Sequence, residues 1–292
     1  VGEQAAKELG IDQVYTELLP GDKVQKLEEI MARKSKKGKV AFVGDGVNDA
    51  PSLKFADIGV AMGITGTDVA KGAADMILTD DNFTTIVHAI EEGRNIYNNI
   101  KKAVIFLLSC NLGEVIAIFV AILLDMPVPL IATQILWVNL ITDALPALAL
   151  GVDPGDHDVM KNKPRDPKES FFAHGAGYRA IVGGVLIGTL TLAAFYFGLT
   201  EFGHGIFSND IPDRDLEYAR TMAFVVLASS QLFYSISLRH DTKSIFQIGL
   251  FSNKYLIGAI VVGLILQMSV IEIDALAAIF KCVDLSTSDW QM

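Results

Sequence analysis

The chain has 292 residues, of which 51% are hydrophobic, and its mean hydropathy of +0.40 is too high for an ordinary soluble domain. A formal net charge of −10 at pH 7 leaves no basic stripe to neutralise phosphates, which argues against a nucleic-acid partner. The two cysteines, Cys110 and Cys282, have neither a CxxC nor a Cys/His spacing, which argues against a disulfide framework or a zinc site.

The residues before Ala103 are charged and mixed, and their pattern predicts a soluble α/β domain. A helix at Asp22–Arg33 precedes a strand at Val40–Val43, and shorter strands are expected at Ile58–Met62 and Met76–Leu78. Strands that alternate with helices predict a parallel sheet, whose ligands bind at the carboxyl ends of the strands.

Two acidic residues follow the first of these strands, within the segment GDGVNDAP. Asp45 and Asp49 lie near one another at the strand end, with Asn48 between them, and the glycines on either side of Asp45 let a ligand approach the backbone. Hard oxygen ligands of this kind suit Mg²⁺. A turn in which Asn48 or Asp49 caps the next helix explains the same spacing, and the spacing alone leaves both interpretations open.

Long apolar runs alternate with short polar connections from Ala103 onward, and a run of about 17–25 residues is what the hydrocarbon core of a bilayer requires of a helix. Five spans surrounded by membrane lipid are predicted, at 103–124, 129–152, 180–199, 221–238 and 255–271. Glycine pairs in the third span (Gly184 and Gly188) and the fifth (Gly258 and Gly263) favour close packing between helices.

The charges of the connecting segments predict the orientation of the chain in the membrane. Basic residues precede the first span (Lys101 and Lys102) and occupy the second-to-third and fourth-to-fifth connections, the latter beginning with Arg239, whereas the third-to-fourth connection is acidic. Under the positive-inside rule the basic loops and residues 1–100 are cytoplasmic. Five spans would leave the tail at 275–292 outside with no return helix, which predicts that the sequence is cut from something longer.

Polar residues inside the predicted spans are expensive in lipid and are candidates for function. Asn111 and Glu114 share one face of the first span. Asn139, Thr142 and Asp143 share one face of the second. Amide, hydroxyl and carboxylate oxygens together are the ligands that Ca²⁺ prefers.

Pro146 cannot donate a backbone hydrogen bond to the carbonyl of Thr142 and disrupts the helix there. The carbonyl oxygen of Thr142 is then available as a further ligand. In an alternative interpretation the Asn and Thr side chains join helices to one another and the acids pair with neighbours. The five spans contain no Lys or Arg that could neutralise Glu114 and Asp143, which favours a cation site.

Six segments of the chain resemble P-type cation-transporting ATPases, and the similarity extends from about Ala5 to about Trp290. The segments are Pro20–Lys23 (PGDK), Gly44–Pro51 (GDGVNDAP), Ala61–Gly63 (AMG), Asp80–Phe83 (DDNF), Glu92–Arg94 (EGR) and Asn98–Lys101 (NNIK). The run GDGVNDAP resembles the hinge motif of that family and is highly specific.

The resemblance implies a fold class. A partial phosphorylation domain of the haloacid-dehalogenase-like α/β type, with its stalk, is expected at 1–97, followed by an α-helical transmembrane bundle at 98–274 and a truncated tail at 275–292. It also implies phosphoryl transfer through an aspartyl-phosphate. Asp45 would then be a Mg²⁺ ligand, with Asn48 and Asp49 organising the cofactor site. Lys23 would offset phosphate charge.

The aspartate that the family phosphorylates, within a DKTGT motif, does not occur in this sequence. The resemblance also implies a nucleotide-binding domain, which holds most of the ATP, an actuator domain and one more span, none of which the sequence contains. The chain is therefore expected to be a fragment whose partner is the missing amino-terminal portion, and to be inactive toward ATP on its own.

The membrane segments resemble calcium pumps of the sarcoplasmic-reticulum and secretory-pathway kind, through Ser109–Val115 and Trp137–Pro146 (WVNLITDALP). Sodium–potassium pumps typically have Asp where this chain has Asn139. The resemblance thus implies ATP-driven Ca²⁺ export, with Na⁺ and Mn²⁺ as alternative ions. Calcium pumps that carry two ions have a glutamate where this chain has Gln231, which implies one Ca²⁺ per cycle.

Two further alternatives belong to other classes. A non-catalytic membrane protein that binds or regulates a pump as a partner subunit explains the missing DKTGT motif equally well. A membrane-anchored phosphatase is disfavoured, because the nucleophilic Asp-x-Asp of such enzymes is also missing. The compact loops and the lack of an extended regulatory tail favour a bacterial plasma membrane as the location.

Overall fold

The computed structural model describes residues 2–36, 38–163, 165–166, 168–205, 207, 211–240, 243 and 245–285. The chain divides into two compact units, one formed by residues 1–93 with 158–169 and the other by residues 94–157 with 170–292. Helix α5 (Thr84–Leu123) runs from the first unit into the second, so the boundary expected after residue 97 lies inside a continuous helix.

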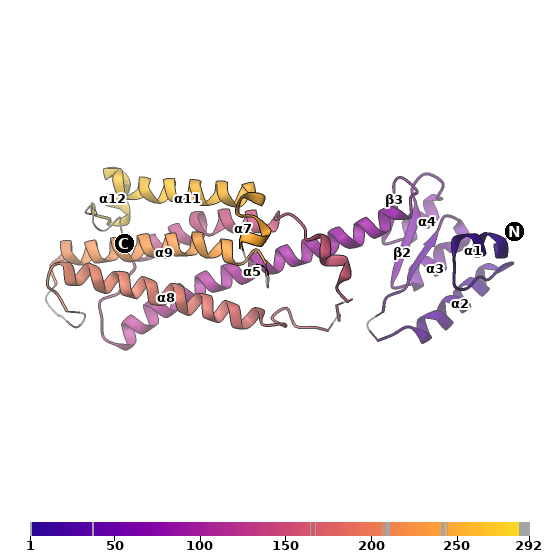
Figure 1. The fold of residues 1–292 in the computed structure, drawn as a ribbon, viewed down its shortest axis with the longest axis horizontal. Coiled ribbons are helices and arrows are strands. Elements are labelled where there is room, and N and C mark those ends of the chain that lie inside the picture. The colour runs from indigo at the N-terminus through magenta and orange to yellow at the C-terminus, as the bar shows by residue number, and fades with distance from the viewer. Residues whose placement is uncertain are drawn as a thin grey trace. The chain divides into compact units, whose positions relative to one another are not determined.

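The first unit is a small α/β domain (Figure 1). Its three strands, β1 (Ala41–Gly44), β2 (Ile58–Met62) and β3 (Met76–Leu78), are parallel and lie in the order β1-β2-β3. The helices of this unit before α5 are α1 (Gly2–Leu9), α2 (Pro20–Arg33), α3 (Ala50–Phe55) and α4 (Asp68–Ala73). Leu53, Ala61 and Ala70 form its buried core. The predicted α/β class and parallel sheet are therefore confirmed.

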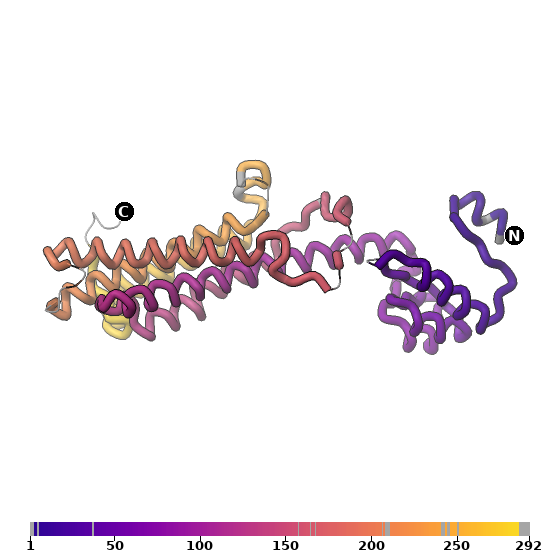
Figure 2. The backbone as a smooth tube through the Cα atoms, turned by 90° about the horizontal axis from the view of Figure 1, so that it is seen from below, coloured from indigo at the N-terminus to yellow at the C-terminus, as the bar shows by residue number. Residues whose placement is uncertain are grey.

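The second unit is helical, and both views show its long helices side by side (Figures 1 and 2). They are the later part of α5, α8 (Ala176–Glu201), α9 (Asp213–Ser237) and α11 (Lys254–Glu272). Shorter elements complete it: α6 (Ala132–Trp137), η2 (Val138–Thr142), α7 (Ala144–Gly151), α10 (Ile245–Ile248), η4 (Leu250–Ser252) and α12 (Asp274–Phe280). One large apolar core joins them.

Four helical stretches among the described residues are long and apolar enough to cross a membrane, namely 84–123, 132–151, 176–201 and 254–272. They overlap four of the five predicted spans. The predicted span at 221–238 overlaps α9, which is long enough but is not among these four stretches. A membrane role for α9 stays a prediction.

The second span is not a regular helix. Between α6 and α7 the chain forms a π-helical turn, η2, in which the amide of Asp143 donates to the carbonyl of Val138 at 2.9 Å. The π turn lies one helical turn before Pro146. A proline ring crowds the carbonyl four residues earlier, and proline has no backbone N–H to donate to that carbonyl. Single π turns of this kind are common at functional sites.

Glycines set the distance between α5 and α8. A Cβ on Gly188 would lie 2.8 Å from the carbonyl oxygen of Gly113, and a Cβ on Gly184 would lie 2.8 Å from the Cβ of Leu112. The Gly184–Gly188 pair therefore packs against α5, as the GxxxG spacing indicates. The other pair differs, because Gly263 packs against Leu232 while Gly258 has no atom within 4 Å of a built Cβ.

The first part of the predicted tail forms most of a short helix, α12 (Asp274–Phe280). Helix α12 places Phe280 against Trp137, with ring centroids 5.3 Å apart, and against Phe224 at 6.4 Å. The segment to residue 285 thus packs on the helical unit, because its aromatic side chain has an apolar surface to cover. Residues 286–292 of the tail lie outside the described residues.

Candidate functional site

Three helical segments bring their polar side chains together around Glu114, which is buried in α5. The amide nitrogen of Asn139, in the π turn, donates to its Oε2 at 2.9 Å. The amide nitrogen of Gln231, in α9, donates to its Oε1 at 3.3 Å. Residues that lie 25 and 117 positions away in the sequence thus meet at one carboxylate.

Asp143 follows the π turn directly and is fully buried. Neither of its carboxylate oxygens has a hydrogen-bond partner of normal geometry among the described residues, and its neighbours include the buried Cys110 thiol and Glu114. The Oε1 atom of Gln231 is buried and without a partner in the same way. Buried oxygens are almost always satisfied, so these three oxygens beside Glu114 are free to act as ligands, and a cation site there stays a prediction.

The remaining predicted ligands lie differently. Thr142 is buried within the π turn, next to Asp143 in the chain. Asn111 is exposed, and its amide donates to the carbonyl of Leu107 in its own helix at 2.8 Å. A spacing of three residues leaves it about 60° around the helix from Glu114, which is enough to turn it out of the buried group. A role for Asn111 in the site stays a prediction.

The ligand set is therefore mixed in type. Among the residues that the structure describes, no group of three His, Cys, Asp or Glu side chains is placed to hold a metal ion. Two carboxylates are supplemented by amide and hydroxyl oxygens, a set that suits a hard cation such as Ca²⁺ better than a soft one.

In the first unit, the segment after β1 folds around Asp49. This residue ends the short turn η1 (Val47–Asp49) and is buried, and its Oδ2 accepts from the amides of Gly46 at 3.1 Å and Asp45 at 3.3 Å. Its Oδ1 accepts from Lys23 at 2.7 Å. A Cβ on Gly44 would lie 2.6 Å from that of Asp49, so only glycine fits at the strand end. The structure thus joins Lys23 and Asp49 directly.

Electrostatics keeps Asp49 ionised. Its burial acts to raise the pKa of the carboxyl, but the hydrogen bond from Lys23 and the amide of Gly46 outweigh that effect, so the pKa is lowered. Its carboxylate is therefore occupied by the lysine and by the loop itself. The predicted role of Asp49 in organising the site stays a prediction.

Asp45 and Asn48 lie on the exposed side of the same loop. Asp45 follows β1 directly, and its backbone carbonyl accepts from the amide of Thr67 at 2.8 Å, which fixes its position. Of the two predicted carboxylate ligands for Mg²⁺, Asp45 is thus the one whose side chain is exposed and not held by Lys23. Mg²⁺ is usually bound by one or two carboxylates, while waters and substrate oxygens supply its remaining ligands. The side chain of Asp45 fits such a site as one of these carboxylates.

A second acidic residue at the same edge of the sheet was not predicted as a site residue. Asp81 accepts the backbone amides of Gly63, Ile64 and Thr65 at 2.6, 2.9 and 2.8 Å. These bonds, that of Ile64 first, lower its pKa to about 2. Two separate sequence motifs, AMG and DDNF, are thereby tied together beyond β2 and β3. Their proximity was readable only from the parallel sheet order.

The chain thus has an exposed carboxylate at the end of a parallel strand, followed by apolar helices that bury two carboxylates, those of Glu114 and Asp143. Comparison with family models agrees. Residues 127–292 match the cation-transporting ATPase carboxyl-terminal family, and residues 14–90 match the haloacid dehalogenase-like hydrolases.

The curated relatives are consistent with these matches. The chain is 52% identical to calcium-transporting ATPase 1 of Bacillus cereus, over 98% of this chain and 35% of that protein. It is 49% identical to a calcium-transporting ATPase of Bacillus subtilis, over 87% of this chain and 27% of that one. It is 45% identical to calcium-transporting ATPase type 2C member 1 of Mus musculus, over 86% of this chain and 26% of that protein.

The chain therefore belongs to the P-type cation-transporting ATPases, as its motifs indicate. It is an integral membrane protein with a haloacid dehalogenase-like region. It spans about a third or less of the length of these relatives.

Proposed function

We propose that this chain forms the carboxyl-terminal part of a pump that exports Ca²⁺ through an aspartyl-phosphate intermediate. The observation that carries the proposal is the group of buried oxygens at Asp143, Glu114 and Gln231, which lacks a positive charge among the described residues. The names of the relatives, all calcium-transporting ATPases, support Ca²⁺ as the transported ion.

The side chains suggest how the site accepts the ion. The amide nitrogens of Asn139 and Gln231 face Glu114 and donate to its two carboxylate oxygens. An Asn or Gln amide carries an acceptor oxygen at its other end, so a turn of the side chain exchanges a donor for a ligand. We expect the Asn139 amide to turn when Ca²⁺ binds between Glu114 and Asp143, with Gln231 contributing its unpaired Oε1 and Thr142 its hydroxyl.

One Ca²⁺ per cycle fits this ligand set. Ca²⁺ sites gain affinity from the number of their carboxylates, and this site has two, Glu114 and Asp143. Gln231 supplies a neutral oxygen where the two-ion pumps that the chain resembles have a glutamate. A second site would need charge that the described helices do not supply.

The loop after β1 would serve the phosphoryl chemistry. Asp45 would hold Mg²⁺, which offsets phosphate charge and orients the transferred group when bound. Lys23 is held at the loop by Asp49 at 2.7 Å, and its ammonium would offset phosphate charge. Asn48 is exposed on the same loop. The aspartyl nucleophile and most of the ATP site would come from residues outside this sequence.

The proposed location is a bacterial plasma membrane with residues 1–100 in the cytoplasm. Two of the relatives are Bacillus proteins, which supports a bacterial source. The orientation follows from the basic residues near the ends of the predicted spans.

Asp143→Asn in the full-length protein tests the proposal. Because Asp143 is one of two carboxylates in the site, the variant is expected to lose Ca²⁺-dependent phosphorylation by ATP. Asp125→Asn, an exposed acid just after α5, is the matched control and should be labelled like the wild type. The acid-stable phosphoenzyme is measured against Ca²⁺ concentration, with Na⁺ and Mn²⁺ in parallel. Normal labelling of Asp143→Asn at micromolar Ca²⁺ would show that the site is misassigned.

A further inference from the structure

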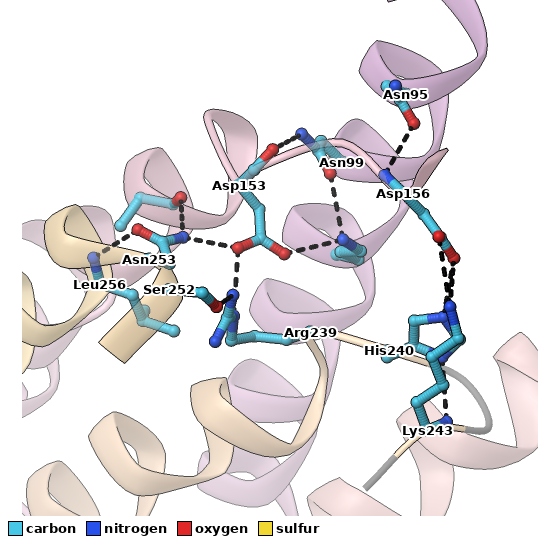
Figure 3. Close-up of polar contacts among 12 residues, drawn as sticks. Asn95, Asn99, Asp153, Asp156, Arg239, His240, Lys243, Ser252, Asn253 and Leu256 are labelled. Atoms are coloured by element: carbon cyan, nitrogen blue, oxygen red, sulfur yellow. Dashed lines mark hydrogen bonds and ion pairs between the residues drawn. The ribbon is translucent and has the colours of Figure 1, made fainter. Parts of the chain in front are cut away.

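A second polar group lies in the helical unit, about two to three helical turns along the chain from the cation ligands. It consists of Asn99, Lys102, Asp153, Arg239 and Asn253, here called the Asp153 cluster (Figure 3). No residue of it belongs to the candidate cation site. Its centre, Asp153, is 6% exposed, and Arg239 is 4% exposed, so the charges are held inside the protein.

Every acceptor of Asp153 is occupied. Its Oδ2 accepts from Lys102 at 2.9 Å, and its Oδ1 accepts from Arg239 at 3.1 Å and from Asn253 at 2.8 Å. Its backbone carbonyl accepts from Asn99 at 2.7 Å. Figure 3 shows Asn99, Arg239 and Asn253 approaching Asp153 from different segments. A charged group whose acceptors all have hydrogen-bond donors is held firmly in one position.

The donors come from the same helices as the cation ligands. Lys102 lies on α5, twelve residues or about 18 Å before Glu114 along the helix. Arg239 follows the end of α9, eight residues after Gln231. Asp153 follows the end of α7, ten residues after Asp143. Each of the three ligand-bearing segments is thus tied to Asp153.

Arg239 is itself anchored, which makes the tie rigid. Its other two nitrogens donate to the carbonyl of Gly249 at 3.1 Å and to the hydroxyl of Ser252 at 2.6 Å. Asn253 also donates to the carbonyl of Ala149 in α7 at 3.0 Å and caps α11 through Leu256 at 2.9 Å. The cluster therefore holds the last turn of α7 from several sides.

We propose that Asp153 is a positioning residue that sets the spacing of Glu114, Asp143 and Gln231, and hence the affinity of the site for its cation. This inference rests on the proposed function of that site. A helix is stiff over ten residues, so fixing α5 at Lys102 relative to the carboxyl ends of α7 and α9 restricts where their ligands can lie. Ligands held in advance at the right distances bind a cation more tightly than ligands that must be gathered.

Lys102→Gln removes the ion pair between Lys102 and Asp153 with the least disturbance to the rest of the cluster. The wild-type cluster carries two positive charges and one negative charge, so removing Lys102 leaves the Asp153–Arg239 pair balanced. The Ca²⁺ concentration for half-maximal phosphorylation by ATP is expected to rise about tenfold, a change typical of losing a group that orients metal ligands. The maximal phosphoenzyme level is expected to stay unchanged, because the ligands themselves remain.

Asp156→Asn is the matched control. Asp156 lies three residues beyond Asp153 and is also ion-paired, with Lys243 at 3.0 Å and His240 at 3.1 Å, two residues that are not members of the Asp153 cluster (Figure 3). In the Asp156→Asn variant, the Ca²⁺ concentration for half-maximal phosphorylation should equal that of the wild type. An equal rise in Asp156→Asn would overturn the proposal, because any disturbance of this segment would then have the same effect.

Asp153→Asn and the double variant Lys102→Gln/Asp153→Asn complete a cycle. If the two residues act through their contact, the double variant shifts the Ca²⁺ dependence no further than the larger single shift. Where Asp153→Asn does not fold, Lys102→Gln alone decides. Wild-type half-saturation in Lys102→Gln, with phosphorylation abolished in Asp143→Asn, would overturn this inference and leave the proposed function standing. Normal phosphorylation of Asp143→Asn would remove both.

Discussion

Replacing Gly188 by alanine tests how closely α5 and α8 depend on their glycines. The added Cβ would lie 2.8 Å from the carbonyl oxygen of Gly113 and 3.0 Å from the side chain of Ile116. The first contact is with backbone, which cannot turn aside, so the helices must move apart. Overpacking of this kind costs about 1–3 kcal/mol, against a gain of about 0.8–1.0 kcal/mol in helix propensity. The net expected destabilisation is about 1 kcal/mol.

Gly258→Ala is the matched control, because the same substitution in α11 meets no atom within 4 Å. It keeps the gain in helix propensity without the clash, so the two variants should differ by about 2 kcal/mol in free energy of unfolding. Unfolding of the full-length protein by dodecyl sulfate in mixed micelles, followed by circular dichroism, measures the difference. Equal unfolding midpoints for the two variants would refute the packing argument.

Two further predictions concern the ions. Asp45→Ala should suppress phosphoenzyme formation or raise the Mg²⁺ concentration that it requires, because the exposed carboxylate after β1 is the proposed Mg²⁺ ligand; an unchanged Mg²⁺ dependence would contradict that role. Equilibrium binding of radioactive calcium to the full-length protein should give one Ca²⁺ per phosphorylatable site, because Gln231 replaces a carboxylate; a ratio near two with cooperative binding would show that this glutamine does not limit the number of ions.

Much of the first unit could be predicted because its signals are local. The strands at Ile58–Met62 and Met76–Leu78 have the predicted bounds, and the first strand is shifted by one residue to Ala41–Gly44. Short apolar runs ending in glycine and aspartate carry that information within a few residues. The pairing of Lys23 with Asp49, 26 residues apart, depends instead on how α2 packs, which no local pattern encodes.

The helical unit shows where sequence reasoning stops. Basic residues near span ends predict orientation, and Lys102 and Arg239 were interpreted in that way alone. The structure pairs both with the buried Asp153, across 51 and 86 positions of the chain. A buried charge and a solvated one have the same letter in a sequence. Only the contact partner distinguishes them, and that partner is set by the packing of whole helices.

The π turn explains why Asp143 and Asn139 serve different purposes although they lie four residues apart. In a regular helix both would face the same neighbour one turn apart. The wider turn at Val138–Thr142 inserts an extra residue into the spacing, so that Asn139 reaches Glu114 while Asp143 keeps both oxygens free in the interior. Pro146 alone predicts a disrupted helix but not the direction in which ligands turn. A site that offers unpaired oxygens on one side and a satisfied carboxylate on the other needs that local irregularity.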